Sequence, residues 1–427
     1  MNDKPAQTGT EIGPVIAGLS AYMADVPDRD VPEEVAEKGK HHFLDTIGAM
    51  VSGAVLKPGR LAVAYVRAQG GTAEASVPGS DVVTTAVNAA LAGGIAAHAD
   101  ETDDSHPESF SHPGCGVVPA ALAMAEREGS SGTEFLRAVV FGYDLAARST
   151  MAIGADRLYH RQHRSSHSLA ALFGAAGAAS VLARLTAEQC RWALSYTAQQ
   201  ASGIACWARD EQHVEKAFDF GGMGARNGVA AATMVQAGFT GVDDVFSGPR
   251  GFFDAFGGNP EVLARGLGTN FEVMNTHIKR WAVGSPIQAP LNSLEFLMDE
   301  HGIGPGDVAR MEVRVSEREA HVTDNRNMPD ICLQHCLAVM LIDGALDFAM
   351  SHDYPRMGDA AVLAVRSRIA LVSDANLPRR EGIVTVTTTD GRELTRHTPH
   401  VRGTAKNPIT RIEVDAKVAD LMAPVLG

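Results

Sequence analysis

Cysteine is scarce in this sequence and follows no recognisable pattern. The chain of 427 residues contains five, without a CxxC pair: Cys115, Cys190, Cys206, Cys332 and Cys336. An odd, scattered set excludes a disulfide framework and is typical of a reducing compartment. We therefore expect no disulfide bridge and a cytoplasmic protein.

Long apolar runs are also missing. The longest apolar segment, residues 169–185, is rich in Ala and Gly and is interrupted by Ser180 and Arg184, so it falls short of a membrane span. Residues 1–13, MNDKPAQTGTEIG, are polar and lack the apolar core of a signal peptide. Both observations predict a soluble protein without an export signal.

Positive charge is in short supply. The formal net charge is −14 and the pI is about 5.6, so nucleic acid and anionic membranes would be repelled. A small anionic substrate would meet the same repulsion unless its site contains its own Lys or Arg. The hydrophobic content of 45% is sufficient for a sizeable core in one large domain or two.

The hydrophobic pattern changes along the chain. Small apolar residues at helical spacing dominate residues 84–185, which indicates closely packed helices. From about residue 270, strand-like alternation follows in MEVRVSE and in GIVTVTTTDGRELTRH, where Asp390-Gly391 predicts a hairpin turn. The predicted fold is mostly α, with a large helical domain over residues 1–270 and a smaller α+β domain over residues 271–400.

The densest run of chemically capable side chains is HADETDDSHPESFSHPGCGVVP, residues 98–119. Pro107 and Pro113 interrupt any regular helix, whereas the flanking segments have the small apolar composition of buried helices. Carboxylates and imidazoles held between buried helices must be paired, hydrogen-bonded or shifted in pKa. A cleft satisfies that requirement most simply.

Three interpretations of this loop remain open. It is a solvated surface, a metal site or a metal-free acid/base site. The metal interpretation rests on His98, His106 and His112, although no ligand spacing such as HExxH is present. In the third interpretation, imidazole and carboxylate exchange protons with a bound substrate.

The arrangement HADETDDSHPESFSHPGCGVVPAALA resembles the signature of the MmgE/PrpD family, approximately HAxDFDDT, a short spacer and HPGAxxxPAxLA. That family includes 2-methylcitrate dehydratase, cis-aconitate decarboxylase and iminodisuccinate epimerase, which act on small di- and tricarboxylates without a metal or organic cofactor. The resemblance implies a homodimer. It also implies that residues 271–400 form a lid domain and that residues 401–427 return to the helical domain.

Within this loop we expect His112 to be the catalytic base, because an imidazole titrates near neutral pH. Asp100 would orient His112 or act as its partner acid. Asp104 and Ser105 match the family's DDT element, so the resemblance implies that both bind the substrate, Ser105 through its hydroxyl.

Two further stretches extend the resemblance through the helical half. HRQHRSSHSLAALFGAAGAA resembles a motif that begins Gly-aromatic-His-x-Thr, and its His falls on His167, with Ser165-Ser166 in place of the Gly-aromatic pair. DEQHVEKAFDFGGMGARNGVAAATMVQAGFTG places Lys216 on a family lysine. We predict that His167 and Lys216 bind substrate. A surface His at a helix start and an ion pair between Lys216 and Asp219 are the structural alternatives.

The C-terminal half supplies three more candidates. THIKRWAVGSPIQAPLNSLEFLM places Lys279 on the family's active-site lysine and Gln288 where His is common. An amide binds a carboxylate but cannot exchange a proton near neutral pH. His335 stands where the decarboxylase-like members have Tyr, which points to a branch with another substrate. The alternative for His335 is a core histidine.

These residues together predict a metal-independent, 2-methylcitrate dehydratase-like lyase that removes a proton next to a carboxylate of a small di- or tricarboxylate. Lys216 and Lys279 would supply the local positive charge that the acidic chain otherwise lacks. An epimerase or isomerase, a metal-dependent hydrolase and a non-catalytic carboxylate-binding protein are the alternatives. We expect no cofactor, and a cleft that the two domains close around the substrate.

Overall fold

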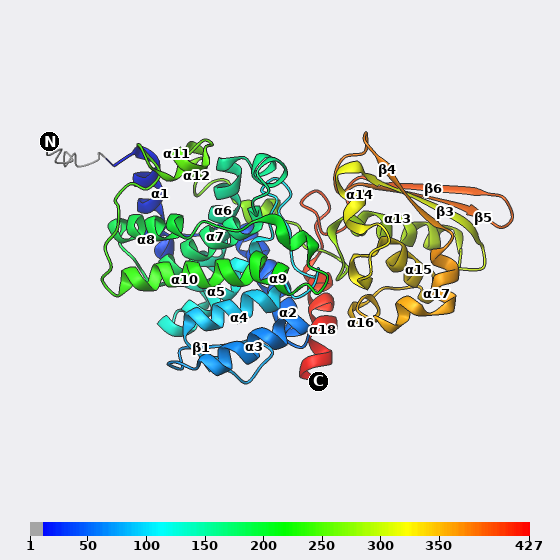
Figure 1. The fold of residues 1–427 in the computed structure, drawn as a ribbon, viewed down its shortest axis with the longest axis horizontal. Helices are drawn as coiled ribbons and strands as arrows, with labels where there is room; N and C mark the ends of the chain where they lie inside the picture. The colour runs from blue at the N-terminus through cyan, green and yellow to red at the C-terminus, as the bar shows by residue number, and fades with distance from the viewer. Residues whose placement is uncertain (1–11) are drawn as a thin grey trace.

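The computed structural model describes residues 12–427, which form a large helical lobe beside a smaller mixed lobe (Figure 1). The polar N-terminal segment behind the expectation of no export signal lies outside the described residues, apart from residues 12 and 13. Among the described residues, no single helix has the length and apolar character to cross a membrane. Helices α2 and α3 meet that criterion only as a pair bent by 82°.

The helical domain contains the first twelve α-helices and a two-stranded β1–β2 ribbon (Ala75–Ser76 and Val83–Thr84). Short 3₁₀ or π turns join several of them, among them η3 (Ala205–Arg209) and η4 (Phe218–Gly222). The helices are α1 (Pro14–Asp25), α2 (Glu33–Ala54), α3 (Lys57–Gln69), α4 (Ala86–Ala97), α5 (Pro113–Glu128), α6 (Gly132–Ile153), α7 (Ser166–Leu182), α8 (Ala187–Gln199), α9 (Val214–Ala217), α10 (Met223–Gln236), α11 (Phe252–Phe256) and α12 (Glu261–Ala264).

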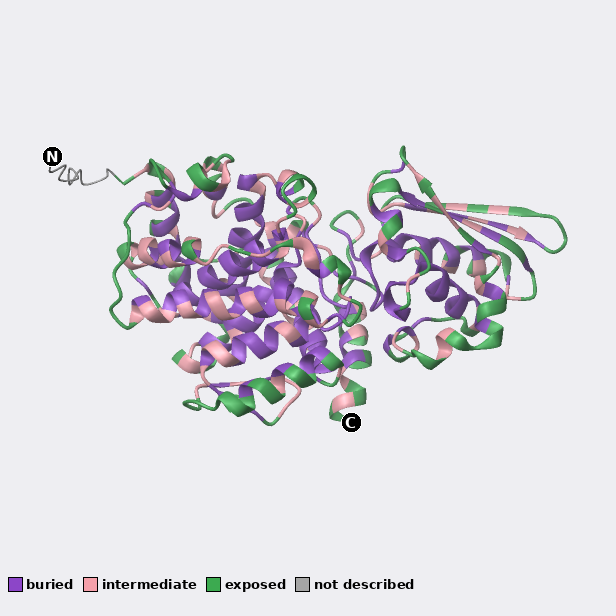
Figure 2. Ribbon diagram, viewed as in Figure 1, coloured by how far each residue is buried: buried purple, intermediate pink, exposed green. Residues whose placement is uncertain are grey.

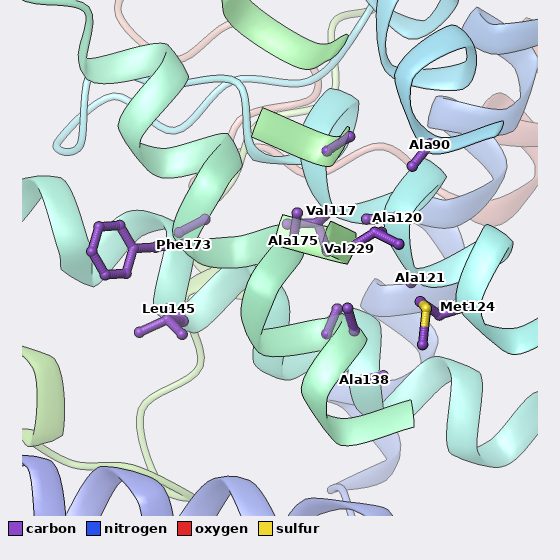
Figure 3. Close-up of a cluster of buried hydrophobic side chains, with 14 of the residues drawn as sticks. Ala90, Val117, Ala120, Ala121, Met124, Ala138, Leu145, Phe173, Ala175 and Val229 are labelled. Carbon is purple, nitrogen blue, oxygen red and sulfur yellow. The ribbon is translucent and has the colours of Figure 1, made fainter. Parts of the chain in front are cut away.

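Helix α7 runs through the centre of this domain and packs against α5, α6 and α10. Its composition is almost wholly small, which allows the neighbouring backbones to approach closely. A Cβ on Gly228 of α10 would lie 2.4 Å from the backbone nitrogen of Ala176, so only glycine fits there. Figure 3 shows this core, in which Val117 of α5 and Val229 of α10 lie beside Ala175 of α7.

The second domain packs α13 (Ser285–His301) and α15 (Leu333–Asp343) beneath a four-stranded sheet of order β4-β3-β5-β6. Strands β3 and β4 are parallel, and the other neighbours are antiparallel. The predicted hairpin joins β5 to β6, with Gly391 at φ +88° in its turn. The remaining bounds are β3 (Val308–Ser316), α14 (Glu317–Thr323), α16 (Phe348–Ser351), α17 (Ala360–Arg366), β4 (Ile369–Asp374), β5 (Gly382–Thr388) and β6 (Glu393–Thr398).

The last helix, α18 (Arg411–Leu426), crosses back and packs on α2 of the helical domain. Figure 2 shows separate buried interiors in the two lobes, and the large hydrophobic clusters likewise run from Ile16 to Val273 and from Trp281 to Val401. The predicted fold class, mostly α with a large helical domain and a smaller α+β domain, is confirmed.

Candidate active site

A cavity of about 270 Å³ lies between the two domains, close to the roughly 300 Å³ at which small-molecule sites begin. Its lining combines imidazoles, aromatic rings and charged groups. The helical domain contributes Glu101, His106, Phe110, His112, Tyr159, His160, His167, Trp207, Asp210, His213, Lys216 and Phe220, among others. The second domain contributes Ser285, Arg318, Glu319, His321, Arg326, Arg379 and Arg380, among others.

The 98–112 loop forms the floor of this region and is not a solvated surface. Apart from the exposed Glu108, its carboxylates are almost completely buried, with Asp103 and Asp104 at 0% exposure and Glu101 at 5%. Helix α5 begins directly after it at Pro113. The solvated-surface interpretation is therefore wrong, because each buried carboxylate is instead paired with an imidazole, an ammonium or an N–H group.

Asp103 is the centre of this network. Its Oδ2 accepts from His98 Nδ1 at 2.9 Å, and its Oδ1 accepts from His112 Nδ1 at 3.2 Å. The ammonium group of Lys279 lies 3.6 Å from the same Oδ1. Burial works to raise the pKa of Asp103, but His98 and His112 outweigh it and hold that pKa well below its usual value.

His112 has the geometry of a positioned base. Its bond to Asp103 fixes the proton on Nδ1, which leaves Nε2 as the nitrogen available to a ligand in the cavity. Burial lowers its pKa to about 4, although Asp103 opposes that shift. The ring is therefore neutral near pH 7 and able to accept a proton.

Glu101 is held between two ammonium groups. Lys216 Nζ bonds to its Oε1, and Lys279 Nζ lies 3.8 Å from its Oε2 while donating to the Glu101 backbone oxygen at 2.6 Å. Burial raises the pKa of Glu101, but the two lysines outweigh it and keep that pKa well below the usual range. Lys216 lines the main cavity, whereas Lys279 lines a smaller adjoining one of about 20 Å³. The Asp219 alternative does not hold, because Lys216 pairs with Glu101 instead.

Asp100 does not line either cavity. It accepts from the backbone and hydroxyl of Thr102 at 2.9 and 2.6 Å, and its Oδ2 lies 2.9 Å from His352 Nε2. The carboxylate that faces the cavity is its neighbour Glu101. Asp100 therefore joins the loop to the residue that follows α16 in the second domain, and among the described residues it makes no hydrogen bond or ion pair with His112.

Asp104 and Ser105 also lie away from the main cavity. Asp104 accepts from His42 Nδ1 at 2.7 Å, from the Tyr143 hydroxyl at 2.6 Å and from the Gly114 backbone at 3.0 Å. Asp104 thus braces the loop against the helices beneath it. Ser105 lines the smaller cavity beside Lys279, and its backbone pairs with His277.

His167 is brought to the main cavity and packs face to face on Phe220, with ring centroids 3.7 Å apart. Its ring also lies 5.3 Å from that of His112. Phe220 belongs to the π turn η4 that follows Lys216, and Trp207 packs edge-on against it at 4.6 Å. The sequence analysis missed this aromatic wall. Its one signal was the position of Phe220, inside the stretch that carries Lys216.

Gln288 and His335 do not reach the main cavity. The amide of Gln288 bonds to the backbone around Trp281 and Val283, so it shapes the turn that carries Lys279. His335 lies at 0% exposure in α15 of the second domain, and burial lowers its pKa to about 4. Its placement matches the core-histidine alternative.

Within residues 12–427, two groups place three ligand atoms within 4.8 Å of one another: His98, Asp103 and Cys115, and His98, Glu101 and His213. The histidines of the metal alternative, His98, His106 and His112, do not form such a group, and both ring nitrogens of His106 are engaged, with the backbone N–H of Ser109 at 3.1 Å and Glu272 at 3.2 Å. A cation at Glu101 would also face the Lys216 and Lys279 ammonium groups, which repel it.

Two family models match this chain, the MmgE/PrpD N-terminal domain over residues 17–264 and the MmgE/PrpD C-terminal domain over residues 281–427. The chain belongs to the MmgE/PrpD family. The main cavity is lined by residues of both matched segments, and His112 belongs to the N-terminal one.

Curated relatives of this MmgE/PrpD chain carry decarboxylase names. The cis-aconitate decarboxylase-like protein oryM of Aspergillus oryzae is 28% identical over 310 residues, 67% of this chain and 62% of the relative. The cis-aconitate decarboxylase of Aspergillus terreus is 26% identical over 317 residues, 70% and 62% of the two chains. The human cis-aconitate decarboxylase is 25% identical over 423 residues, 90% and 83%. The chain thus spans about three fifths of the length of the two fungal relatives.

Proposed function

We propose that this protein is a metal-independent lyase of the 2-methylcitrate dehydratase kind, acting on a small di- or tricarboxylate by removing a proton next to a carboxylate. The observation that carries the proposal is the setting of His112. Asp103 holds its Nδ1, its Nε2 is left to the cavity, and its pKa of about 4 keeps it neutral near pH 7. An anionic ligand raises that pKa toward neutrality, where proton transfer is most efficient.

In the proposed reaction, His112 Nε2 takes a proton from the carbon next to a substrate carboxylate. The electron pair of the broken C–H bond moves into that carboxylate, which gains negative charge. The pair then returns to form a carbon–carbon double bond while a hydroxyl on the neighbouring carbon departs. The proton gained by His112 balances the one that this hydroxyl needs to leave as water.

The two lysines support this chemistry from different positions. Lys216 faces the cavity and is the cation that a substrate carboxylate meets there. Its ammonium group also pairs with Glu101. Lys279 lies behind the loop and acts on Asp103 and on the backbone of Glu101. Positive charge in a buried, water-poor site stabilises a developing dianion far better than the same charge in water.

An epimerase of a dicarboxylate is the second candidate. It needs the same proton removal and a second group that returns the proton to the other face of the carbon. The observation in its favour is the second imidazole on the cavity, His167, beside His112. The names of the relatives suggest decarboxylation as a third reaction to test, in which carbon dioxide leaves in place of the proton.

One experiment separates these outcomes. A panel of di- and tricarboxylates is incubated with the protein in deuterated water, and exchange at carbon, absorbance of a new double bond, release of carbon dioxide and product stereochemistry are followed. A double bond formed with loss of water supports the dehydratase. Exchange with inversion and no double bond replaces it with the epimerase, and a protein that binds carboxylates without exchanging any proton is not a lyase of this kind.

A further inference from the structure

The wall that the second domain presents to the cavity is strongly basic. It carries four arginines and one glutamate: Arg318, Arg326, Arg379, Arg380 and Glu319. This gathering of positive charge stands out in a chain whose net charge is −14. Because the mechanism proposed above uses only groups from the loop, Lys216 of α9 and Lys279, this wall has no role in it.

Glu319, at the start of α14, organises two of these arginines. Its Oε1 accepts from Arg379 Nε at 3.2 Å, and its Oε2 accepts from the backbone N–H of Arg380 at 2.9 Å. The Arg379 guanidinium also lies over the ring of Phe110 at 4.2 Å, so it is engaged with the 98–112 loop. Glu319 is itself 4% exposed and therefore forms a fixed anchor.

Arg380 is held differently from Arg379. Its Nε lies 3.3 Å from Glu319, but its two terminal Nη groups make no hydrogen bond to any described residue. Its backbone has φ +68°, a left-handed conformation that is uncommon for a residue with a side chain and marks a position held by its surroundings. Arg380 thus presents two terminal Nη groups without a partner among the described residues, while its Nε faces Glu319.

Ser285 lines the same cavity as Arg380. It is the first residue of α13, a helix of 17 residues, so it sits where the partial positive charge of the helix dipole is greatest. Ser285 is 9% exposed, and its buried Oγ has no hydrogen-bond partner among the described residues. Of the residues that line the two neighbouring cavities, Arg380 and Ser285 are the two that line both.

We propose that Arg380, Ser285 and the first turn of α13 form a binding subsite for a second carboxylate of the substrate. This inference rests on the proposed function and adds to it the residues that bind the second carboxylate. One carboxylate lies against Lys216 next to the base, and another lies against Arg380 in the second domain. A monocarboxylate leaves the guanidinium edge and the Ser285 hydroxyl unpaired, so the protein selects dicarboxylates and tricarboxylates over it.

The subsite also explains how a ligand would hold the domains together. A molecule bound to Lys216 on one side and Arg380 on the other spans the cavity between the two lobes. Its affinity therefore depends on two charged contacts from separate domains, and the loss of either one weakens binding without removing the other.

The test uses calorimetric binding of succinate, tricarballylate and citrate to the full chain. Arg380→Gln should raise Kd about 10- to 100-fold, because a charge-assisted hydrogen bond is lost. Arg380→Lys should raise Kd by less than Arg380→Gln does, since an ammonium keeps the charge but not the planar fork of the guanidinium. Ser285→Ala should raise Kd a few-fold, and Arg392→Gln on the exposed β5–β6 turn is the matched control with unchanged Kd.

Comparison with succinamate, in which one carboxylate of succinate is an amide, separates recognition from a structural role. The unaltered protein should prefer succinate over succinamate, and Arg380→Gln should abolish that preference. Equal weakening of both ligands, an unchanged Kd in Arg380→Gln, or no binding of any of the three probes to the unaltered protein overturns the subsite.

Failure of the subsite can be distinguished from failure of the proposed reaction. His112→Gln removes the base but leaves Arg380 and Ser285 in place, so it should still prefer succinate over succinamate as the unaltered protein does. A protein that binds the probes through Arg380 but never exchanges a proton keeps the subsite and loses the lyase. A protein that exchanges protons equally well without Arg380 keeps the lyase and loses the subsite.

Discussion

The imidazole of His112 and the ammonium group of Lys279 meet at a single oxygen atom, Asp103 Oδ1, at 3.2 and 3.6 Å. Lys279 lies on the segment that leads into α13, whereas His112 directly precedes α5. Because both groups contact the same carboxylate, the orientation of the His112 imidazole is coupled to the position of the second domain. A displacement of that segment would move the Lys279 ammonium group away from Asp103, the carboxylate that holds the imidazole.

His112→Gln should abolish turnover and leave folding intact. The amide keeps most of the side-chain volume but cannot accept a proton, and loss of a general base typically costs about 10²- to 10⁴-fold in rate. Deuterium exchange into the substrate and thermal unfolding at pH 7 are the measurements. Activity equal to that of the unaltered protein would remove His112 from the mechanism.

Replacement of the two lysines should have different kinetic effects. Lys216→Met removes a cation that faces the cavity, so we expect KM to rise. Lys279→Met acts behind the loop through Asp103 and Glu101, so we expect kcat to fall about 10²-fold with a smaller change in KM. Steady-state kinetics on the same substrate compare the two. An identical pattern in both variants would contradict the separate positions assigned to them.

The pH dependence of kcat/KM should reflect the buried imidazole. The pKa of His112 in the free protein is about 4, because burial lowers it. A base must be neutral, so activity should persist as the pH falls through 6.5 and decline only near pH 4. Asp103→Asn removes the charge that opposes the effect of burial, and the acid limb should then move lower. An acid limb near 6.5 in the unaltered protein would show that another group is the base.

The His352–Asp100 pair should stabilise the fold at neutral and lower pH. Burial alone lowers the pKa of His352, but Asp100 and Asp330 outweigh it and raise that pKa to about 9. The unfolded value is about 6.5, so the contribution is complete below pH 6.5 and is lost as the pH rises through 9. It amounts to at most on the order of 3 kcal/mol.

His352→Gln should therefore have a lower Tm than the unaltered protein at pH 6, and the difference should shrink as the pH approaches 9. Thermal unfolding of both proteins at several pH values measures this. His397→Gln is the matched control, because His397 pairs with Glu381 on the exposed face of the sheet. A difference in Tm for His352→Gln that grows with pH would contradict the assignment of a raised pKa.

Gly94→Ala should disturb both the fold and the site. A Cβ at Gly94 of α4 would lie 2.7 Å from the carbonyl carbon of Gly221, so α4 and η4 must separate. Overpacking of this kind costs about 1–3 kcal/mol. It also shifts Phe220, which stacks on His167, so turnover should fall with stability.

Gly18→Ala is the matched control, because a Cβ there meets nothing within 4 Å on the exposed side of α1. It should stabilise the helix by about 0.5–1 kcal/mol. Chemical unfolding and substrate turnover of the two variants are compared. Unchanged unfolding of Gly94→Ala would mean that the two backbones are not in contact.

The sequence by itself determined the fold class and the general place of the site. Small residues at helical spacing specify closely packed helices wherever they occur, and strand alternation after residue 270 specifies a sheet. The 98–112 loop was identifiable because a run of ionisable groups between two buried helices has to lie at an internal polar site. These conclusions depend on the composition and spacing of residues within short segments, which the sequence shows directly.

Only the tertiary structure decided which of those groups face the ligand. Asp100 and Glu101 are adjacent and chemically alike, yet one reaches His352 and the other reaches Lys216. His335 belongs to the second core, and Arg379 and Arg380 of the basic wall come from the loop between β4 and β5, which carries no signal of its own. A side chain's direction depends on the backbone conformation of an irregular loop and on contacts with residues hundreds of positions away, and neither follows from local periodicity.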